Sequence, residues 1–155
     1  MSKPKLSITR RWPKAVEEAA KEEFDVTLND KDIPLSIEDM SNALKRYDAI
    51  SPTVTDILSP KVFDVENFSC KILCNYGVGY SHIDIPSAKN LGICVTNTPD
   101  VLSDCTADIA MALMLMAARR AGEGERELRA DKWHGWRPTH MIGAKVTGKT
   151  LGIIG

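Results

Sequence analysis

The sequence predicts an α/β protein in which a parallel sheet carries helices on both faces. Two observations predict this class: short apolar segments with strand character alternate with amphipathic segments of helical spacing, and the connections between them are short. The 155 residues suffice for one domain, or for one domain and part of a second, with about 68 to 70% of the extended surface buried on folding. The chain is therefore long enough to form a substantial core.

The expected elements follow one another in a regular order. The first, at 5–10, alternates apolar and polar residues as a half-exposed strand does. The helix expected at 13–24 begins with a proline and early acidic residues and is rich in strong helix formers. After a strand at 25–29, a second helix is expected at 36–47, where a serine and an aspartate precede apolar residues at helical spacing.

The same alternation continues as far as residue 99. Segment 48–54 comes next, followed by a helix expected at 59–68, a strand at 71–77, a helix at 84–92 and a strand at 93–99. Connections this short favour parallel strands joined by crossover helices.

From about Asp104 the pattern changes to a long helix. It continues to about Arg120, is hydrophobic nearly all round, and is therefore expected to pack on several sides. Gly122 and Gly124 are expected to interrupt it, before a second, amphipathic helix at 123–133 and a loop rich in aromatic residues.

A domain boundary is expected between Thr98 and Ser103. On this interpretation residues 1–102 form one domain, and residues 103–155 contain linking helices and the first strand of another, at 149–155. A short apolar strand that ends in glycine is typical of the start of a dinucleotide-binding domain, but one such strand occurs in most α/β proteins.

Composition argues against several classes of partner. The 20 basic and 21 acidic residues leave a formal net charge of −1, which gives no reason to expect nucleic acid or a membrane as partner. The longest apolar run, 109–118, would span only about half a bilayer and is expected to be a buried helix. The N-terminus lacks an apolar segment of signal-peptide length, so we expect a cytoplasmic protein.

The cysteines indicate neither a disulfide framework nor a metal site. Their spacing is too irregular for a CxxC pair or a zinc knuckle, so reduced, buried thiols and no metal are expected. The four positions are Cys70, Cys74, Cys94 and Cys105.

A phosphate-loop pattern near the end of the chain is misleading. Gly143, Gly148, Lys149 and Thr150 satisfy G-x-x-x-x-G-K-[ST], a motif that binds phosphate only when a strand precedes it and a helix follows. The preceding residues contain a proline and no β-branched run, and those that follow favour a strand over a helix. The pattern is therefore interpreted as a turn into the strand expected at 149–155.

The segment "NYGVGYSHID", residues 75–84, is the strongest candidate for a binding loop. Two glycines flank Val78 directly after an expected strand, at the sheet edge where open α/β proteins bind ligands, and could turn backbone N–H groups outward toward a carboxylate. An ordinary glycine turn explains the loop equally well. If it is an anion site, binding should survive Val78→Ala and suffer from Gly79→Val, because a β-branched residue resists the torsions that glycine adopts.

The segments "NYGVGY", "VTNTP" and "TAD", with the residues around them from 75 to 155, resemble the D-isomer-specific 2-hydroxyacid dehydrogenases. The resemblance covers the whole chain, is weakest before Asp48, and is closest to the glyoxylate and hydroxypyruvate reductase branch. It implies a flavodoxin-like substrate domain followed by the beginning of a Rossmann-type cofactor domain.

The resemblance also implies roles for individual residues. Main-chain N–H groups matching Val78 and Gly79 bind the substrate carboxylate in the family, and the segment matching 52–55 lines the substrate pocket, which makes Thr53 and Val54 candidates.

Three further positions follow from the same resemblance. Thr106 matches a position that faces the cofactor, and Gly155 matches the first glycine of the dinucleotide fingerprint. Trp136 matches an aromatic residue that some members extend toward the active site of a partner subunit, although anchoring of a surface loop explains it equally well.

The family's catalytic arginine, glutamate and histidine match no residue of this chain. His82, His134 and His140 lie at other positions, so no catalytic residue is assigned here, and the chain is expected to be an inactive fragment that does not bind the cofactor itself. The intact enzyme is expected to be a homodimer that uses NAD or NADP on a small 2-oxo or 2-hydroxy acid. The choice between the two cofactors stays open, because the residue that selects between them follows the second strand of the cofactor domain. A non-enzymatic binding or dimerisation module, or a pseudogene product, is the alternative.

Overall fold

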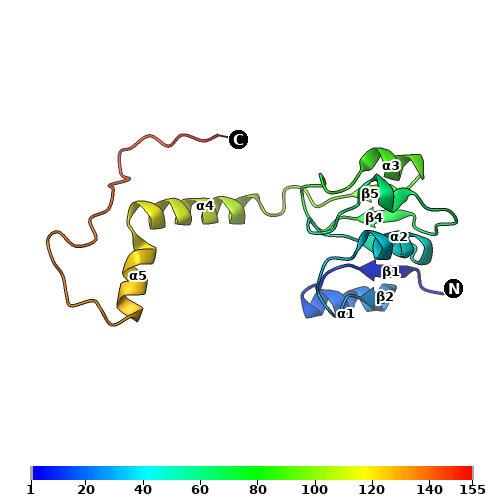
Figure 1. Ribbon diagram of the computed structural model, residues 1–155, viewed down its shortest axis with the longest axis horizontal. Coiled ribbons are helices and arrows are strands. Elements are labelled where there is room, and N and C mark those ends of the chain that lie inside the picture. The colour runs from blue at the N-terminus through cyan, green and yellow to red at the C-terminus, as the bar shows by residue number, and fades with distance from the viewer. Residues whose placement is uncertain (1, 155) are drawn as a thin grey trace. The chain divides into compact units, whose positions relative to one another are not determined.

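The computed structural model describes residues 2–154 and contains an all-parallel sheet of five strands in the order β2-β1-β3-β4-β5 (Figure 1). The strands are β1 Lys5–Ile8, β2 Asp25–Leu28, β3 Ala49–Ser51, β4 Ile72–Cys74 and β5 Cys94–Thr96. The helices are α1 Lys14–Glu23, α2 Ile37–Arg46, the 3-10 helix η1 Pro60–Phe63, α3 Ile85–Asn90, α4 Ser103–Ala118 and α5 Ala121–Arg129. The predicted α/β class with a flavodoxin-like parallel sheet is confirmed.

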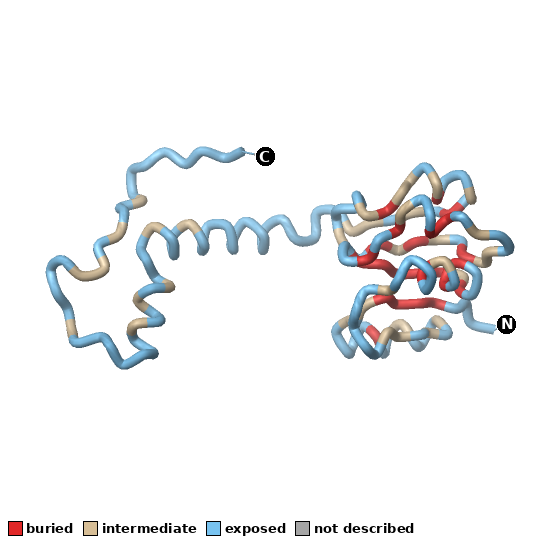
Figure 2. Tube along the Cα trace, in the orientation of Figure 1, coloured by how far each residue is buried: buried red, intermediate tan, exposed pale blue. Residues whose placement is uncertain are grey.

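The chain divides into two compact units, Met1–Val101 and Leu102–Gly155, and each is described by itself. The first contains the whole sheet, and its buried residues concentrate on the strands and the helices that flank them (Figure 2). In the second, no residue of α4 or α5 is buried.

Side-chain alternation along the strands gives the sheet two packed faces. On β1, Leu6 and Ile8 join Ala49 in a small cluster against which Ala20 of α1 packs. On the opposite face, Ile50 of β3 belongs to a larger cluster that includes residues of α2, η1 and α3. Helices therefore cover both faces, as parallel sheets require.

Local sequence signals explain where α2 begins. The side chain of Ser36 accepts a hydrogen bond from the Asp39 N–H at 3.1 Å, which caps the helix as the sequence predicts. Met40, Ala43 and Leu44 then lie on one stripe and are buried against the sheet.

The helix expected at 59–68 is only partly formed. The structure has the single 3-10 turn η1, and further along the chain Asn67 adopts a φ of 56°. A left-handed residue cannot belong to a continuous α-helix, so the helix does not extend to residue 68.

The break between α4 and α5 is not at the glycines, so that expectation is wrong. Gly122 and Gly124 lie inside α5, and the chain turns instead at Arg120, whose φ of 56° and ψ of 34° are left-handed. Its guanidinium forms an ion pair with Glu123 at 2.6 Å, which gives this non-glycine residue a local partner. The second helix accordingly begins at Ala121 and not at residue 123.

The expectation that 109–118 would be a buried helix is also wrong for the described residues. Large apolar side chains of α4 stay exposed, with Ile109 at 62% and Leu113 at 60% of their maximum exposure. Their spacing all round the helix leaves no polar face, and the shorter α5 contacts α4 without burying any residue of either helix.

No strand forms at 149–154 within the described part of the chain, in contrast to the prediction. A strand is defined by pairing with a neighbour, and these residues have none among positions 2–154. The predicted turn before them is confirmed, because the Lys149 N–H donates to the Val146 carbonyl at 3.0 Å and Gly148 has a φ of 77°. No helix follows Thr150 up to residue 154, so the phosphate-loop pattern lacks the helix it requires.

The cysteines are free, but they are not all buried as expected. Cys70 is buried, and burial raises the pKa of its thiol to about 11. Cys94 and Cys105 are exposed, because Cys94 lies on the edge strand β5 and Cys105 on the uncovered α4.

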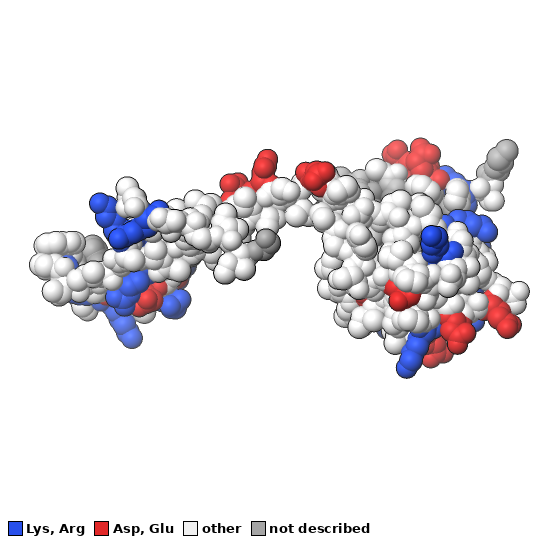
Figure 3. All heavy atoms as spheres, turned by 90° about the horizontal axis from the view of Figure 1, so that it is seen from above, with Lys and Arg blue, Asp and Glu red and all other residues white. Residues whose placement is uncertain are grey.

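Two surface properties bear on the expected partners. Between residues 2 and 154, every helix is too short or too polar to cross a bilayer. Acidic and basic side chains are interspersed on the face shown in Figure 3, where neither sign covers the sheet unit alone.

Candidate functional site

The loops that leave the carboxyl ends of β1, β3 and β4 lie side by side. The Tyr76 N–H donates to the Pro52 carbonyl at 2.8 Å, and Thr53 forms a parallel bridge with Tyr76. The indole of Trp12 packs on the ring of Tyr76, with centroids 5.7 Å apart. Ligands of open α/β sheets bind at this edge, so these loops form the candidate site.

Two adjacent backbone N–H groups in the loop after β4 are free to bind an anion. Val78 and Gly79 are both exposed, and neither N–H donates a hydrogen bond to any residue that the structure describes. The structure therefore places the predicted pair Val78 and Gly79 beside the predicted pair Thr53 and Val54. The exposed Val54 shares this surface, whereas Thr53 is buried at 9% exposure and supports it from below.

The glycine that this loop requires is Gly77, so the expected sensitivity of Gly79 has no basis in the backbone. Gly77 has a φ of 158°, and a Cβ at this position would lie 3.3 Å from Val54 Cγ1. Gly79 has no left-handed torsion, and a Cβ there would meet nothing within 4 Å. The tight approach of the two loops therefore depends on Gly77.

Gly77→Ala is expected to lower the free energy of unfolding by about 1 to 3 kcal/mol, because the added methyl group crowds Val54 in a backbone conformation that few side chains adopt. Gly79→Ala is the matched control and should stay within about 1 kcal/mol of the wild type. Urea unfolding of the two variants gives the comparison. Equal losses of stability would contradict the assignment of Gly77.

A buried carboxylate holds the loop after β3. Asp56 is fully buried, and its Oδ2 accepts hydrogen bonds from the Thr53 N–H at 2.8 Å and from Thr9 Oγ1 at 2.5 Å. Its Oδ1 is buried without a partner among the described residues. Because a buried charge is stable only when it is well bonded, Asp56 fixes the position of Thr53 relative to the end of β1.

Thr9→Val keeps the shape of the buried side chain and removes its hydroxyl, whose oxygen lies 2.5 Å from Asp56 Oδ2 and 3.1 Å from the Ser51 carbonyl oxygen. We expect the free energy of unfolding to fall by about 1 to 3 kcal/mol, because the Asp56 carboxylate loses one of its few partners. Thr27→Val on β2, whose side chain is exposed, serves as the control in the same urea titration. A Thr9→Val variant as stable as this control would contradict the role of Asp56.

Ion pairs position the loop after β1. Arg10 bonds to Asp32 at 3.0 Å and donates to Thr55 Oγ1 at 2.9 Å, so it reaches the loop that carries Thr53 and Val54. Arg11 pairs with the buried Glu17 at 2.7 Å. The hydrogen bond from Arg11 is the main reason that the pKa of Glu17 falls to about 2.

His82 is half-buried beneath the loop after β4. Burial lowers the pKa of its imidazole, and the charge of Asp56 opposes this shift. Its Nε2 lies 2.9 Å from Asn75 Oδ1, so His82 contacts the residue that begins the loop.

The family description "D-isomer specific 2-hydroxyacid dehydrogenase, catalytic domain" matches residues 7–151. The chain belongs to this family. It is 39% identical to the glycerate dehydrogenase of Hyphomicrobium methylovorum over 100% of this chain and 48% of that protein. It is 40% identical to the glyoxylate reductase of Pyrococcus horikoshii over 99% of this chain and 47% of that protein. The chain thus spans about half the length of the curated relatives it matches.

Solved structures give the same result. A crystal structure from Polaromonas sp., described as a putative D-isomer specific 2-hydroxyacid dehydrogenase, superimposes with a TM-score of 0.87 at 36% identity, over 94% of this chain and 46% of that one. An NADPH-dependent glyoxylate/hydroxypyruvate reductase from Sinorhizobium meliloti, in complex with NADP and malonate, gives a TM-score of 0.77 at 28% identity, over 99% of this chain and 46% of that one.

The resemblance to the family predicts three site residues in the second unit: Thr106 and Gly155 for the cofactor, and Trp136 for the active site of a partner subunit. Trp136 is 82% exposed and lines a cavity of about 440 Å³ together with Trp133 and His140. Gly155 lies outside the described residues.

The N-terminus of α4 is the part of the second unit that suits a dinucleotide phosphate. The first turn of α4 has no side-chain cap, which leaves N–H groups for a phosphate. Thr106, however, donates its hydroxyl hydrogen to the Leu102 carbonyl at 2.8 Å. Thr106 therefore fits a cofactor contact through its oxygen, not through its hydrogen.

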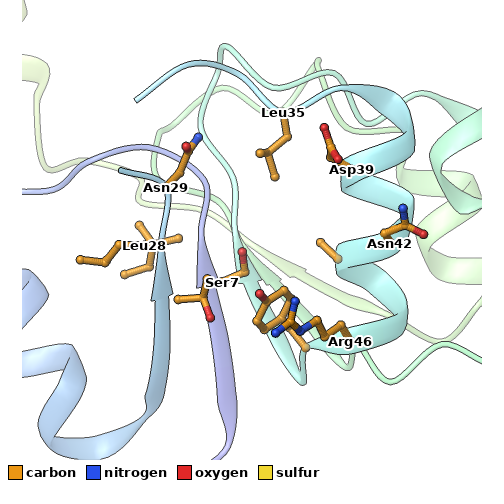
Figure 4. Close-up of a pocket in the computed structure, with 11 residues that line it drawn as sticks. Ser7, Leu28, Asn29, Leu35, Asp39, Asn42 and Arg46 are labelled. Carbon is orange, nitrogen blue, oxygen red and sulfur yellow. The ribbon is translucent and has the colours of Figure 1, made fainter. Parts of the chain in front are cut away.

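A separate cavity of about 300 Å³ lies between strands β1 and β2 on one side and α2 on the other (Figure 4). Two of its polar residues have partners within the fold: Asn29 donates to the Thr9 and Ile33 carbonyls, and Asp39 accepts from Ser36. It contains none of the predicted site residues of the dehydrogenase. Among residues 2–154 no group of three or more His, Cys, Asp or Glu side chains is placed to hold a metal ion.

Sequence reasoning missed several residues that shape this site. Thr9, Asp56, Asn75 and Asn97 are polar residues at or just beyond strand ends, and that position at the carboxyl edge of a parallel sheet was the available signal.

Proposed function

We propose that this chain is the substrate-binding part of an NAD(P)-dependent 2-hydroxyacid dehydrogenase that reduces glyoxylate or hydroxypyruvate. The observation that carries the proposal is the pair of free N–H groups at Val78 and Gly79, at the sheet edge where the family's ligands bind. Relatives named glyoxylate reductase and glycerate dehydrogenase support this class of substrate.

In the proposed reaction these residues bind and orient the substrate. The two N–H dipoles hold the carboxylate, and Val54 provides an apolar contact beside it. The nicotinamide, when bound, supplies the hydride for the carbonyl carbon. A proton donor for the carbonyl oxygen is also needed, and we assign that role to no residue of this chain.

The homodimer, cytoplasmic location and domain roles belong to the same proposal. Residues 1–102 act as the substrate domain, and residues 103–155 act as the link to a cofactor domain. Neither NAD nor NADP is favoured by any residue described here.

A fusion protein tests this function. Residues 1–155 are joined to the part of the Pyrococcus horikoshii glyoxylate reductase that the match does not cover, and glyoxylate-dependent oxidation of NADH or NADPH is measured. We expect turnover in the fusion and a large loss in the same fusion with Gly77→Val. A folded fusion that binds the nucleotide and never reduces glyoxylate or hydroxypyruvate would contradict the proposed function.

A further inference from the structure

Three consecutive carbonyl groups of the loop after β4, those of Gly77, Val78 and Gly79, accept hydrogen bonds from the protein. The Gly77 carbonyl accepts from Asn75 Nδ2 at 3.1 Å and from the Thr98 N–H at 3.1 Å. The Val78 carbonyl accepts from Asn97 Nδ2 at 2.9 Å, and the Gly79 carbonyl accepts from Asn75 Nδ2 at 3.0 Å.

These bonds determine where the free N–H groups point. In a trans peptide the carbonyl and the following N–H point in opposite directions, and no cis peptide occurs among the described residues. A Gly77 carbonyl bonded toward Asn75 therefore turns the Val78 N–H away from Asn75. In the same way, the bond from Asn97 to the Val78 carbonyl turns the Gly79 N–H outward.

We infer that Asn75 and Asn97 are the positioning residues that aim the Val78 and Gly79 N–H groups at the substrate carboxylate. The inference rests on the proposed function for the identity of the ligand, a small carboxylate of a 2-oxo acid. Each asparagine stands at the end of a different strand, Asn75 after β4 and Asn97 after β5, so the sheet itself sets the separation of the two donors.

A third residue fixes the orientation of the Asn75 amide. Both hydrogens of its NH₂ group are used on carbonyls, so its Oδ1 is the acceptor toward His82. His82 Nε2 therefore carries a hydrogen and donates it at 2.9 Å. Asn75 is buried at 1% exposure, and with all three contacts made it has no alternative orientation of equal energy.

The test compares Asn97→Ala with Asn97→Gln in the full 155-residue chain, with oxalate as the probe. Asn97 is only partly buried, so its removal leaves the core intact, and Asn90→Ala at the exposed end of α3 is the control. We expect Asn97→Ala to weaken oxalate binding about tenfold, Asn97→Gln to restore part of it, and Asn90→Ala to change nothing.

The backbone mobility of the loop after β4 in the ligand-free protein provides a second readout. NMR relaxation should show greater mobility of the Gly79 amide in Asn97→Ala and greater mobility of the Val78 amide in His82→Leu. His82→Gln should partly restore the order of the Val78 amide, because glutamine keeps a donor for Asn75. A merely structural role of these residues would change stability without this residue-specific pattern.

The outcomes separate this inference from the proposed function. If the wild-type chain binds no carboxylate, the proposed function fails, and the amide order of Val78 and Gly79 in the variants still decides whether the asparagines orient them. If the wild type binds oxalate and Asn97→Ala binds it equally well with an unchanged Gly79 amide, the positioning role is overturned.

Discussion

Assayed alone, the 155-residue chain is expected to reduce neither glyoxylate nor hydroxypyruvate with NADH or NADPH. A general acid contributes about 10² to 10⁴ in rate, and a group that stabilises charge on the reacting oxygen about 10² to 10³. The expectation rests on the resemblance to the family, in which none of His82, His134 and His140 matches the catalytic histidine.

The measurement is nicotinamide oxidation by protein purified from a host that lacks the corresponding reductases. The control is the fusion with the uncovered part of the glyoxylate reductase, which should turn over under identical conditions. Steady activity of the 155-residue chain above a no-enzyme blank would mean that a catalytic residue has been overlooked.

The chain is also expected to self-associate through α4, and removal of the residues after Val101 should abolish this. Ile109, Leu113 and Leu115 are exposed at 62%, 60% and 46%, although burying one large apolar side chain is worth about 1.5 to 3 kcal/mol. Several such residues on one helix make an exposed patch that favours association.

Sedimentation velocity compares the oligomeric state of residues 1–155 with that of residues 1–101. Both apolar core clusters lie within 1–101, so the shorter chain keeps its core and should sediment as a monomer. Leu113→Glu in the full chain is the matched point variant and should shift it toward the monomer. A full chain that stays monomeric at high concentration would show that α4 does not mediate self-association and that the boundary near Val101 is misplaced.

The sheet could be predicted because each strand carries its own local signal. In β1, Leu6 and Ile8 alternate with the polar Ser7, and the helices between successive strands favour parallel crossover connections. The partial loss of the helix at 59–68 could not be predicted, because it involves the left-handed torsion of Asn67, and asparagine adopts both helical and left-handed conformations. The turn at Arg120 was missed because sequence rules place a left-handed residue at glycine first, and two glycines stood nearby.

In the candidate site, too, local sequence signals could be read in advance and tertiary contacts could not. A glycine-rich loop after a strand led to the prediction of Val78 and Gly79, and the resemblance to the family added Thr53 and Val54; the binding role of all four stays a prediction. The hydrogen bonds of Asn75 and Asn97 could not be predicted, because the carbonyls that accept them are known only once β4 and β5 are paired. Gly77 differs from Gly79 through its φ of 158° and the approach of Val54, and both depend on the folded structure.

The central claim is that Val78 and Gly79 bind a carboxylate through their N–H groups. NMR titration of the isotope-labelled chain with glyoxylate tests it directly, with glycolaldehyde as the control that has the same carbonyl and no carboxylate. We predict saturable shifts of the Val78 and Gly79 amide resonances with glyoxylate and none with glycolaldehyde. Equal responses to both compounds, or saturable shifts confined to the cavity between β1, β2 and α2, would contradict it.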